Sequence, residues 1–270
     1  MLPETATDQE RAELREALGL NDPLYIQYFN YMKDVLRGDF GDSLRYNQPA
    51  LGIVLERLPA SFTLALSSMA VAVLLSVPAG IYSAIKRNTF SDLIITGASV
   101  LGKAMPNFWV GIMLILLFSV NLGIFPVSGS GTLAHLVLPS ITLGTGIAAE
   151  MTRLIRSSML EVLNSEYIRT ARSKGLHEAF VINKHALRNA LIPVVTIMAL
   201  QTSTLIGGTL ITETVFSWPG MGQLLVQAVN LRDMAVVQAA TFIIAILVIL
   251  SNLTADLVYR YLDPRIKYED

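Results

Sequence analysis

The chain alternates between long apolar stretches without charge and short polar segments. Charged residues are absent from residues 59–85, 104–149, 189–212 and 235–255. A helix needs roughly 20 apolar residues to cross the hydrocarbon core of a bilayer. Because Gly, Pro and Ser interrupt the second run at residues 121–132, the pattern predicts five spans, at residues 60–85, 93–121, 136–157, 190–212 and 236–258.

The composition favours a membrane protein over a soluble one. Of the 270 residues, 53% are hydrophobic and 15% are charged, whereas soluble domains carry about 25% charged residues. A net charge of -1 gives no indication of a nucleic-acid partner, and the lack of cysteine excludes disulfides, thiolate metal sites and cysteine nucleophiles. We therefore predict an all-α polytopic membrane protein. Because His135, His177 and His185 do not have the spacing of metal ligands, we also expect no metal site.

The distribution of basic residues predicts the orientation of the spans. Residues 153–188 hold seven Lys/Arg against three Glu, whereas residues 121–132 hold no charge. Because Lys and Arg concentrate in cytoplasmic loops, we expect residues 158–188 and the tail, residues 261–270, to be cytoplasmic. Residues 59–260 then form the transmembrane domain, and residues 1–58 lie on the external side.

The external segment has features of a folded region. Thr7 and Glu10 form a capping-box pattern ahead of apolar residues that recur to Leu18, and a second amphipathic stretch covers residues 23–36. Neither a signal peptide nor an apolar span precedes this segment to carry it across the membrane. We expect that a first span is missing ahead of Met1.

The basic insert "EYIRTARSKGLHEAFVINKHALRNALIP", residues 166–193, divides into two helix-compatible pieces around Gly175. Ser165 is placed to cap the first piece, and Gly175 can adopt the left-handed conformation that turns the chain. Tyr167 and Ala171 fall on one face, which suits docking into the groove of a partner. The alternative interpretation is a basic loop that is attracted to anionic membrane lipid.

Several motifs resemble the binding-protein-dependent permeases of ABC importers. The pattern of Glu166, Thr170, Ala171 and Gly175, followed by "LIP" at residues 191–193, is similar to their cytoplasmic loop. Within this family, the dipeptide, oligopeptide, nickel and glutathione permeases have segments similar to "YIRTARSKGL", "TETVFSWPGMGQLLVQAV" and "DPRIKY". The resemblance implies the type I permease fold, usually with one further span ahead of the external segment.

The same resemblance implies a set of partners and a function. The chain is expected in the cell inner membrane with a second homologous permease, with two ATPase subunits that hold ATP and magnesium, and with an extracytoplasmic substrate-binding protein. No cofactor and no catalytic residue are expected on this chain. The implied cargo is di- or oligopeptides, with nickel chelates or glutathione as alternatives. Residues 166–186 are expected to couple to an ATPase, through Glu166, Tyr167, Arg169, Thr170, Ala171, Arg172, Lys174, Gly175 and Leu176.

Polar residues inside the spans are candidates for a translocation path or gate. Lys103 is ionisable and lies deep in a span, where such residues are functional, paired or snorkelling, and Glu150 is its nearest candidate partner by depth. Hydrogen bonds between helices are the alternative role for the uncharged candidates. The candidate path or gate residues are Lys103, Asn107, Glu150, Gln201, Thr202, Glu213 and Trp218.

Two other interpretations are weighed against an importer. "GASVLGKA", residues 97–104, imitates a phosphate-binding loop, but Ala104 replaces the magnesium-binding hydroxyl and no strand precedes it. We expect this chain to bind no nucleotide. A secondary transporter or channel without an ATPase would favour inverted repeats, and the sequence shows no internal repeat.

Overall fold

The computed structural model describes residues 21–43 and 45–262 of the chain. Within these residues the regular structure is helical, apart from one isolated bridge between Asp42 and Pro49. The helix expected from Thr7 to Leu18 lies outside the described residues, as does most of the predicted tail. The predicted all-α architecture is therefore present across the transmembrane part of the chain.

The chain forms two compact units. The first comprises Met1–Glu56 and Leu224–Ile243. It contains α2 (Leu24–Leu36), which confirms the predicted amphipathic helix. In the same unit, Ser43 Oγ donates a hydrogen bond to Asp233. The second unit comprises Arg57–Gln223 and Ile244–Asp270, and it holds most of the predicted spans.

Within residues 21–43 and 45–262, three helices are long and apolar enough to cross a membrane on their own. They are α3 (Ala50–Ile85), α6 (Leu133–Leu163) and α13 (Met234–Leu262), which also carries the chain out of the first unit and into the second. They correspond to the predicted spans 60–85, 136–157 and 236–258. α6 extends beyond its predicted end because "RLIRSSMLEVL", residues 153–163, continues the helix with polar residues that need not lie in lipid.

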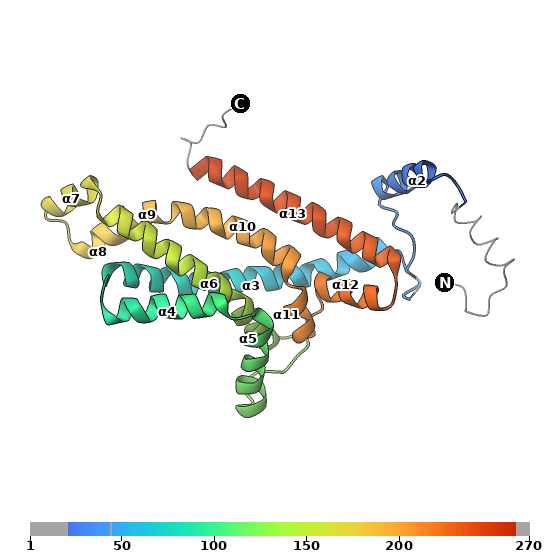
Figure 1. The fold of residues 1–270 in the computed structure, drawn as a ribbon, viewed down its shortest axis with the longest axis horizontal. Helices are drawn as coiled ribbons and strands as arrows, with labels where there is room; N and C mark the ends of the chain where they lie inside the picture. The colour runs from blue at the N-terminus through green and yellow to red at the C-terminus, as the bar shows by residue number, and fades with distance from the viewer. Residues whose placement is uncertain (1–20, 44, 263–270) are drawn as a thin grey trace. The chain divides into compact units, whose positions relative to one another are not determined.

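The predicted span 93–121 is broken in the structure. α4 (Phe90–Ala104) and α5 (Asn107–Leu114), which continues into the π-helix η1 (Ile115–Asn121), meet at an angle of 104°. Pro106 has no backbone N–H, and it restricts the preceding Met105 to an extended conformation with φ -76° and ψ 129°. The helix therefore ends at Ala104 and restarts in a new direction (Figure 1).

The predicted span 190–212 is also divided. It contains α10 (Ile192–Gly208), followed after Thr209 by the short α11 (Leu210–Val215). α12 (Met221–Asn230) follows in the chain.

The helices of the second unit pack closely where glycine replaces a side chain. A Cβ atom at Gly80 would lie 2.7 Å from Ile155, and one at Gly144 would lie 2.8 Å from the Ser68 carbonyl oxygen. α3 and α6 therefore approach nearly to backbone contact, as small residues allow in membrane helices. α4 runs beside α6 (Figure 1).

The basic insert forms a group of short helices at the end of α6 (Figure 1). α7 (Glu166–Ser173) is followed by Gly175 with φ +75°, and then by α8 (Glu178–Phe180), η2 (Val181–Ala186) and α9 (Leu187–Ala190), which leads into α10. The predicted pair of helical pieces around a left-handed glycine is confirmed. Ser165 occupies the predicted N-cap position, although its hydroxyl donates backward to the Val162 carbonyl at 2.6 Å.

Candidate functional site

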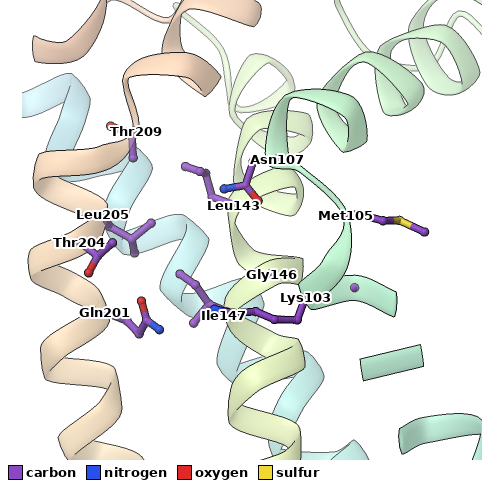
Figure 2. A pocket seen from close by; sticks show the side chains of 11 residues that line it. Lys103, Met105, Asn107, Leu143, Gly146, Ile147, Gln201, Thr204, Leu205 and Thr209 are labelled. Atoms are coloured by element: carbon purple, nitrogen blue, oxygen red, sulfur yellow. The ribbon is translucent and has the colours of Figure 1, made fainter. Parts of the chain in front are cut away.

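A cavity of about 300 Å³ lies where the break between α4 and α5 meets α6 and α10 (Figure 2). Its lining combines amide, hydroxyl and ammonium groups with aliphatic side chains. The lining residues are Gly102, Lys103, Met105, Asn107, Leu143, Gly146, Ile147, Gln201, Thr204, Leu205 and Thr209. A polar cavity between otherwise apolar helices is the principal candidate site within the transmembrane region.

An ion pair connects three helices at this cavity. Lys103 Nζ, in the last turn of α4, lies 2.7 Å from Glu150 Oε2 on α6, and Gln201 Nε2 on α10 donates to the same oxygen at 3.0 Å. Figure 2 shows Lys103 and Gln201 reaching toward each other across α6. The structure therefore forms the Lys103–Glu150 pair that the sequence predicts. The two side chains keep 53% and 32% of their exposure.

The cavity brings together some of the predicted path residues. Lys103, Asn107 and Gln201 line it, and Glu150 bonds two of them although it is not among the lining residues. Thr202, next to Gln201, contributes instead to a different cavity of about 300 Å³ together with Phe62 and residues of α13. Adjacent helix positions point about 100° apart, which explains why these two neighbours separate.

Sequence reasoning did not assign several lining residues to the site. Thr204 follows Gln201 by three positions and so shares its helix face, a signal that the sequence contained. Gly146 and Thr209 carried no such signal. Gly146 matters because a Cβ there would lie 3.3 Å from Asn107 Oδ1, so the glycine leaves room for that amide beside α6.

Glu213 and Trp218 do not line the cavity but belong to a buried network, which reaches the cavity wall through Thr209. Glu213 has no exposed surface, and its carboxylate accepts hydrogen bonds from Ser61 Oγ at 3.0 Å, Thr209 Oγ1 at 2.8 Å and the Gln223 N–H at 3.0 Å. Trp218 Nε1 donates to the Ala60 carbonyl at 2.9 Å. These contacts tie α11 and the loop after it to α3. The predicted role of both residues at an outer gate stays a prediction.

The predicted coupling residues lie on α7 and the turn that follows it. Eight of the nine are exposed, namely Glu166, Tyr167, Arg169, Thr170, Arg172, Lys174, Gly175 and Leu176. Ala171 differs from the expectation of a docking face shared with Tyr167, because only 8% of it is exposed. Ile168 is fully buried, and with Ala171 three positions later it forms the inner face of α7, packed into the core of the chain.

Two polar contacts hold α7 to the segment after it. Arg172 donates two hydrogen bonds to Glu178, at 2.7 and 3.1 Å, across the Gly175 turn. These bonds hold the pKa of the Glu178 carboxyl below its ordinary value and raise the pKa of Arg172. Asn189 Nδ2 donates to the Tyr167 hydroxyl at 2.8 Å. α7 is therefore fixed to α8 and α9 and presents its other side to the surroundings.

Broken spans around a polar cavity are typical of membrane transporters. Comparison with known proteins identifies the family of transporters to which the chain belongs. Residues 76–268 match the family described as "Binding-protein-dependent transport system inner membrane component". The dipeptide transport system permease protein DppB of Alkalihalophilus pseudofirmus is 43% identical, over 99% of this chain and 89% of its own length. The oligopeptide permease AppB of Bacillus subtilis is 43% identical over 99% and 88%.

A glutathione transport system permease, GsiC of Escherichia coli K12, is 42% identical over 95% of this chain and 84% of its own. The chain belongs to the family of binding-protein-dependent ABC importer permeases, within the peptide and glutathione group. It is an inner-membrane transport component rather than an enzyme. The resemblance that the motifs indicate is confirmed.

Solved structures support the predicted type I permease fold. A chain of the inward-facing MetNI methionine ABC transporter matches with a TM-score of 0.66 and 18% identity, over 78% of this chain and 96% of its own. A chain of an amino acid ABC transporter, solved with histidines, matches with a TM-score of 0.59 and 13% identity. At these identities the likeness establishes the fold alone.

Proposed function

We propose that this chain is the membrane-spanning permease subunit of an ATP-driven importer that translocates di- or oligopeptides delivered by a substrate-binding protein. The names of the two 43% identical relatives support a peptide cargo. In this proposal the chain pairs with a second homologous permease above two ATPase subunits, which hold the ATP and magnesium. Its C-terminus and residues 158–188 lie in the cytoplasm, as the basic residues there favour.

The observation that carries the proposal is the construction of α7. Its outer surface is exposed and polar, with a tyrosine among the basic side chains, while Ile168 anchors its inner face without any exposed surface. A helix built in this way can receive a force from a partner subunit and transmit it to the helices beneath. We assign the contact with an ATPase to residues 166–186.

The helices on either side of the insert connect it to the polar cavity. α6 ends at Leu163, just before α7, and carries Ile147 in the cavity wall; at 1.5 Å per residue these two positions are about 24 Å apart. α10 begins at Ile192, at the end of the insert, and carries Gln201 in the opposite wall. In the proposed mechanism, closure of the ATPases on ATP moves α7, and α6 and α10 change the access to the cavity.

The energy that this coupling requires is modest. Shifting a two-state equilibrium from 1:99 to 99:1 takes about 5.5 kcal/mol of differential binding. ATP-driven closure of the ATPase pair can supply a difference of this size. No chemical step on the permease itself is needed, and the hydrolysis of ATP belongs to the partner subunits.

Cysteine crosslinking tests the proposed contact. The chain contains no cysteine, so Thr170→Cys and Lys174→Cys each introduce a unique exposed thiol. We expect both to crosslink to a co-expressed ATPase with a yield that changes on addition of ATP. Ser128→Cys, in the predicted external loop, and the buried Ala171→Cys are matched controls that should give little product.

A negative result has a clear meaning in this experiment. If neither Thr170→Cys nor Lys174→Cys crosslinks in a protein that still transports, α7 is not the coupling element.

A competition experiment tests the cargo. The 42% identical GsiC makes glutathione a specific second candidate. Competition for uptake between a dipeptide and reduced glutathione, in the same complex, separates the two.

A further inference from the structure

We propose that Lys103 and Glu150 form a binding site for a short zwitterionic peptide, in which their mutual ion pair is replaced by two ion pairs with the ligand. Lys103 binds the peptide carboxylate and Glu150 binds its ammonium group. This inference deepens the proposed function and rests on it for the choice of ligand. It assigns a selective binding step to the permease itself, in addition to the selectivity of the substrate-binding protein.

The cavity has the size and lining for a small polar ligand. Its volume of about 300 Å³ is at the lower end of the range of about 300–1,000 Å³ for small-molecule sites. It therefore accommodates one or two amino-acid residues better than a long peptide. Leu143, Ile147 and Leu205 provide apolar walls, while the amides of Asn107 and Gln201 are placed to bond a peptide group.

Both charged groups keep bonding capacity beyond their own ion pair. Glu150 Oε2 accepts the bonds from both Lys103 and Gln201, so Oε1 makes no hydrogen bond to any residue within 21–43 and 45–262. The Lys103 ammonium has three donors, and one of them is used by Glu150. Lys103 lines the cavity and Glu150 lies next to it through the ion pair, and side-chain exposures of 53% and 32% leave both groups accessible.

Charge balance explains why the ligand should be a zwitterion. An isolated charge inside the membrane is costly, and Lys103 and Glu150 neutralise each other by forming an ion pair. A ligand with one charge would leave the loaded site with an unbalanced charge. A peptide with both termini free can replace one internal ion pair by two pairs with the ligand, so the site stays neutral when it is empty and when it is loaded.

The local helix geometry favours the same location. Lys103 stands two residues before Met105, where the span breaks, and broken helices form the binding sites of many transporters. The carbonyl end of α4 favours a cation at Lys103, and the amino end of α5, which begins at Asn107, favours an anion beside it. The carbonyl end of α4 therefore stabilises the Lys103 cation, and a carboxylate bound to Lys103 meets a favourable field from the amino end of α5.

Equilibrium binding to the purified complex, without the substrate-binding protein, tests the site directly. The probe is radiolabelled alanyl-alanine, compared with its N-acetyl and C-amide forms. We expect the free dipeptide to bind about tenfold or more tightly than either capped form, because each cap leaves one charge of the site unpaired. Equal binding of all three peptides would overturn the proposal.

Variants separate a binding role from a structural one. The double variant Lys103→Met/Glu150→Gln removes both charges and keeps the site neutral, so the complex should assemble normally while dipeptide binding falls about tenfold or more. The exchange Lys103→Glu/Glu150→Lys should restore binding in part, because both charges are present again but the carboxylate at position 103 meets the carbonyl end of α4. Thr196→Val, on α10 outside the cavity lining, is the matched control and should bind like the unchanged protein.

The two proposals fail in distinguishable ways. If the double variant binds alanyl-alanine as tightly as the unchanged protein, the ion pair is structural and this inference is wrong, whatever the transport assay shows. If the unchanged complex shows no ATP-dependent uptake of any peptide in proteoliposomes, the proposed function fails. The binding difference between free and capped peptides is measured without ATP and does not depend on that outcome.

Discussion

Arg156 on α6 holds Asp92 on α4 by two parallel hydrogen bonds, from Nε to Oδ1 at 2.7 Å and from Nη2 to Oδ2 at 2.8 Å. Ser83 Oγ and the Asn88 N–H also donate to this carboxylate, which is 5% exposed. One buried carboxylate thus connects the end of α3, the start of α4 and the last third of α6. The arrangement braces the helices near the insert.

Removal of the Asp92 charge should destabilise this brace. In Asp92→Asn, Arg156 loses its bidentate partner, and loss of one partner of a buried pair costs about 3–5 kcal/mol. We expect the lower end, because 26% of the Arg156 side chain is exposed and can reach water. Thermal unfolding in detergent measures the loss. Glu166→Gln is the control, because its pair with Arg169 has exposures of 73% and 81% and should contribute little.

The glycine contact between α3 and α6 makes a second prediction. In Gly144→Ala the new methyl group would lie 2.8 Å from the Ser68 carbonyl oxygen and from Val71, and both helices would have to separate. Overpacking of this kind costs about 1–3 kcal/mol. Gly97→Ala is the matched control, because nothing lies within 4 Å of that position and alanine favours the helix by about 0.5–1 kcal/mol. Equal melting temperatures for the two variants would contradict the close approach.

Some of this fold follows directly from the sequence. The uncharged runs at residues 59–85 and 235–255 predict their helices because they lack charge over enough residues to cross a bilayer. The Gly175 turn was predictable because glycine adopts positive φ without strain. Lys103 and Glu150 could be paired because ionisable residues inside membranes seek partners.

Other features depend on packing that the sequence does not display. Pro59 and Pro78 lie inside α3 and Pro139 lies inside α6, yet only Pro106 stands at the 104° bend. A proline therefore marks a possible break, and the neighbouring helices decide whether it occurs. Burial of Ala171 has the same origin, because the side of α7 that faces inward is set by the helices beneath it.

The buried carboxylate of Glu213 makes a third prediction. Ser61 Oγ donates to Glu213 Oε1 at 3.0 Å and accepts the Met221 N–H at 2.8 Å. Ser61→Ala leaves both groups with one partner fewer, and an unsatisfied buried polar group costs about 1–3 kcal/mol. Thr63→Ala removes an exposed hydroxyl that bonds only within its own helix, to Pro59. We expect a lower melting temperature for the first variant alone; similar values would show that the network adds nothing.

The contact between Arg172 and Glu178 makes a fourth prediction, on pH. Bonds from Arg172 lower the pKa of Glu178 from its ordinary value of 4.5. A depressed pKa means that the contact stabilises the insert fully above about pH 4.5 and that this contribution is lost as the pH falls through the lowered value. Both side chains are partly exposed, at 43% and 54%, so the contact is worth at most about 1 kcal/mol.

Glu178→Gln should therefore speed amide hydrogen exchange in α7 by up to about fivefold at pH 7, because 1 kcal/mol corresponds to that ratio. The difference between the variant and the unchanged protein should stay constant from about pH 8 to pH 5.5 and shrink below the ordinary pKa of Glu178. Glu166→Gln, whose partner Arg169 lies on the same helix, should show a smaller effect. A difference that instead grew as the pH fell would mean that Glu178 is stabilised in its protonated form, contrary to its bonds from Arg172.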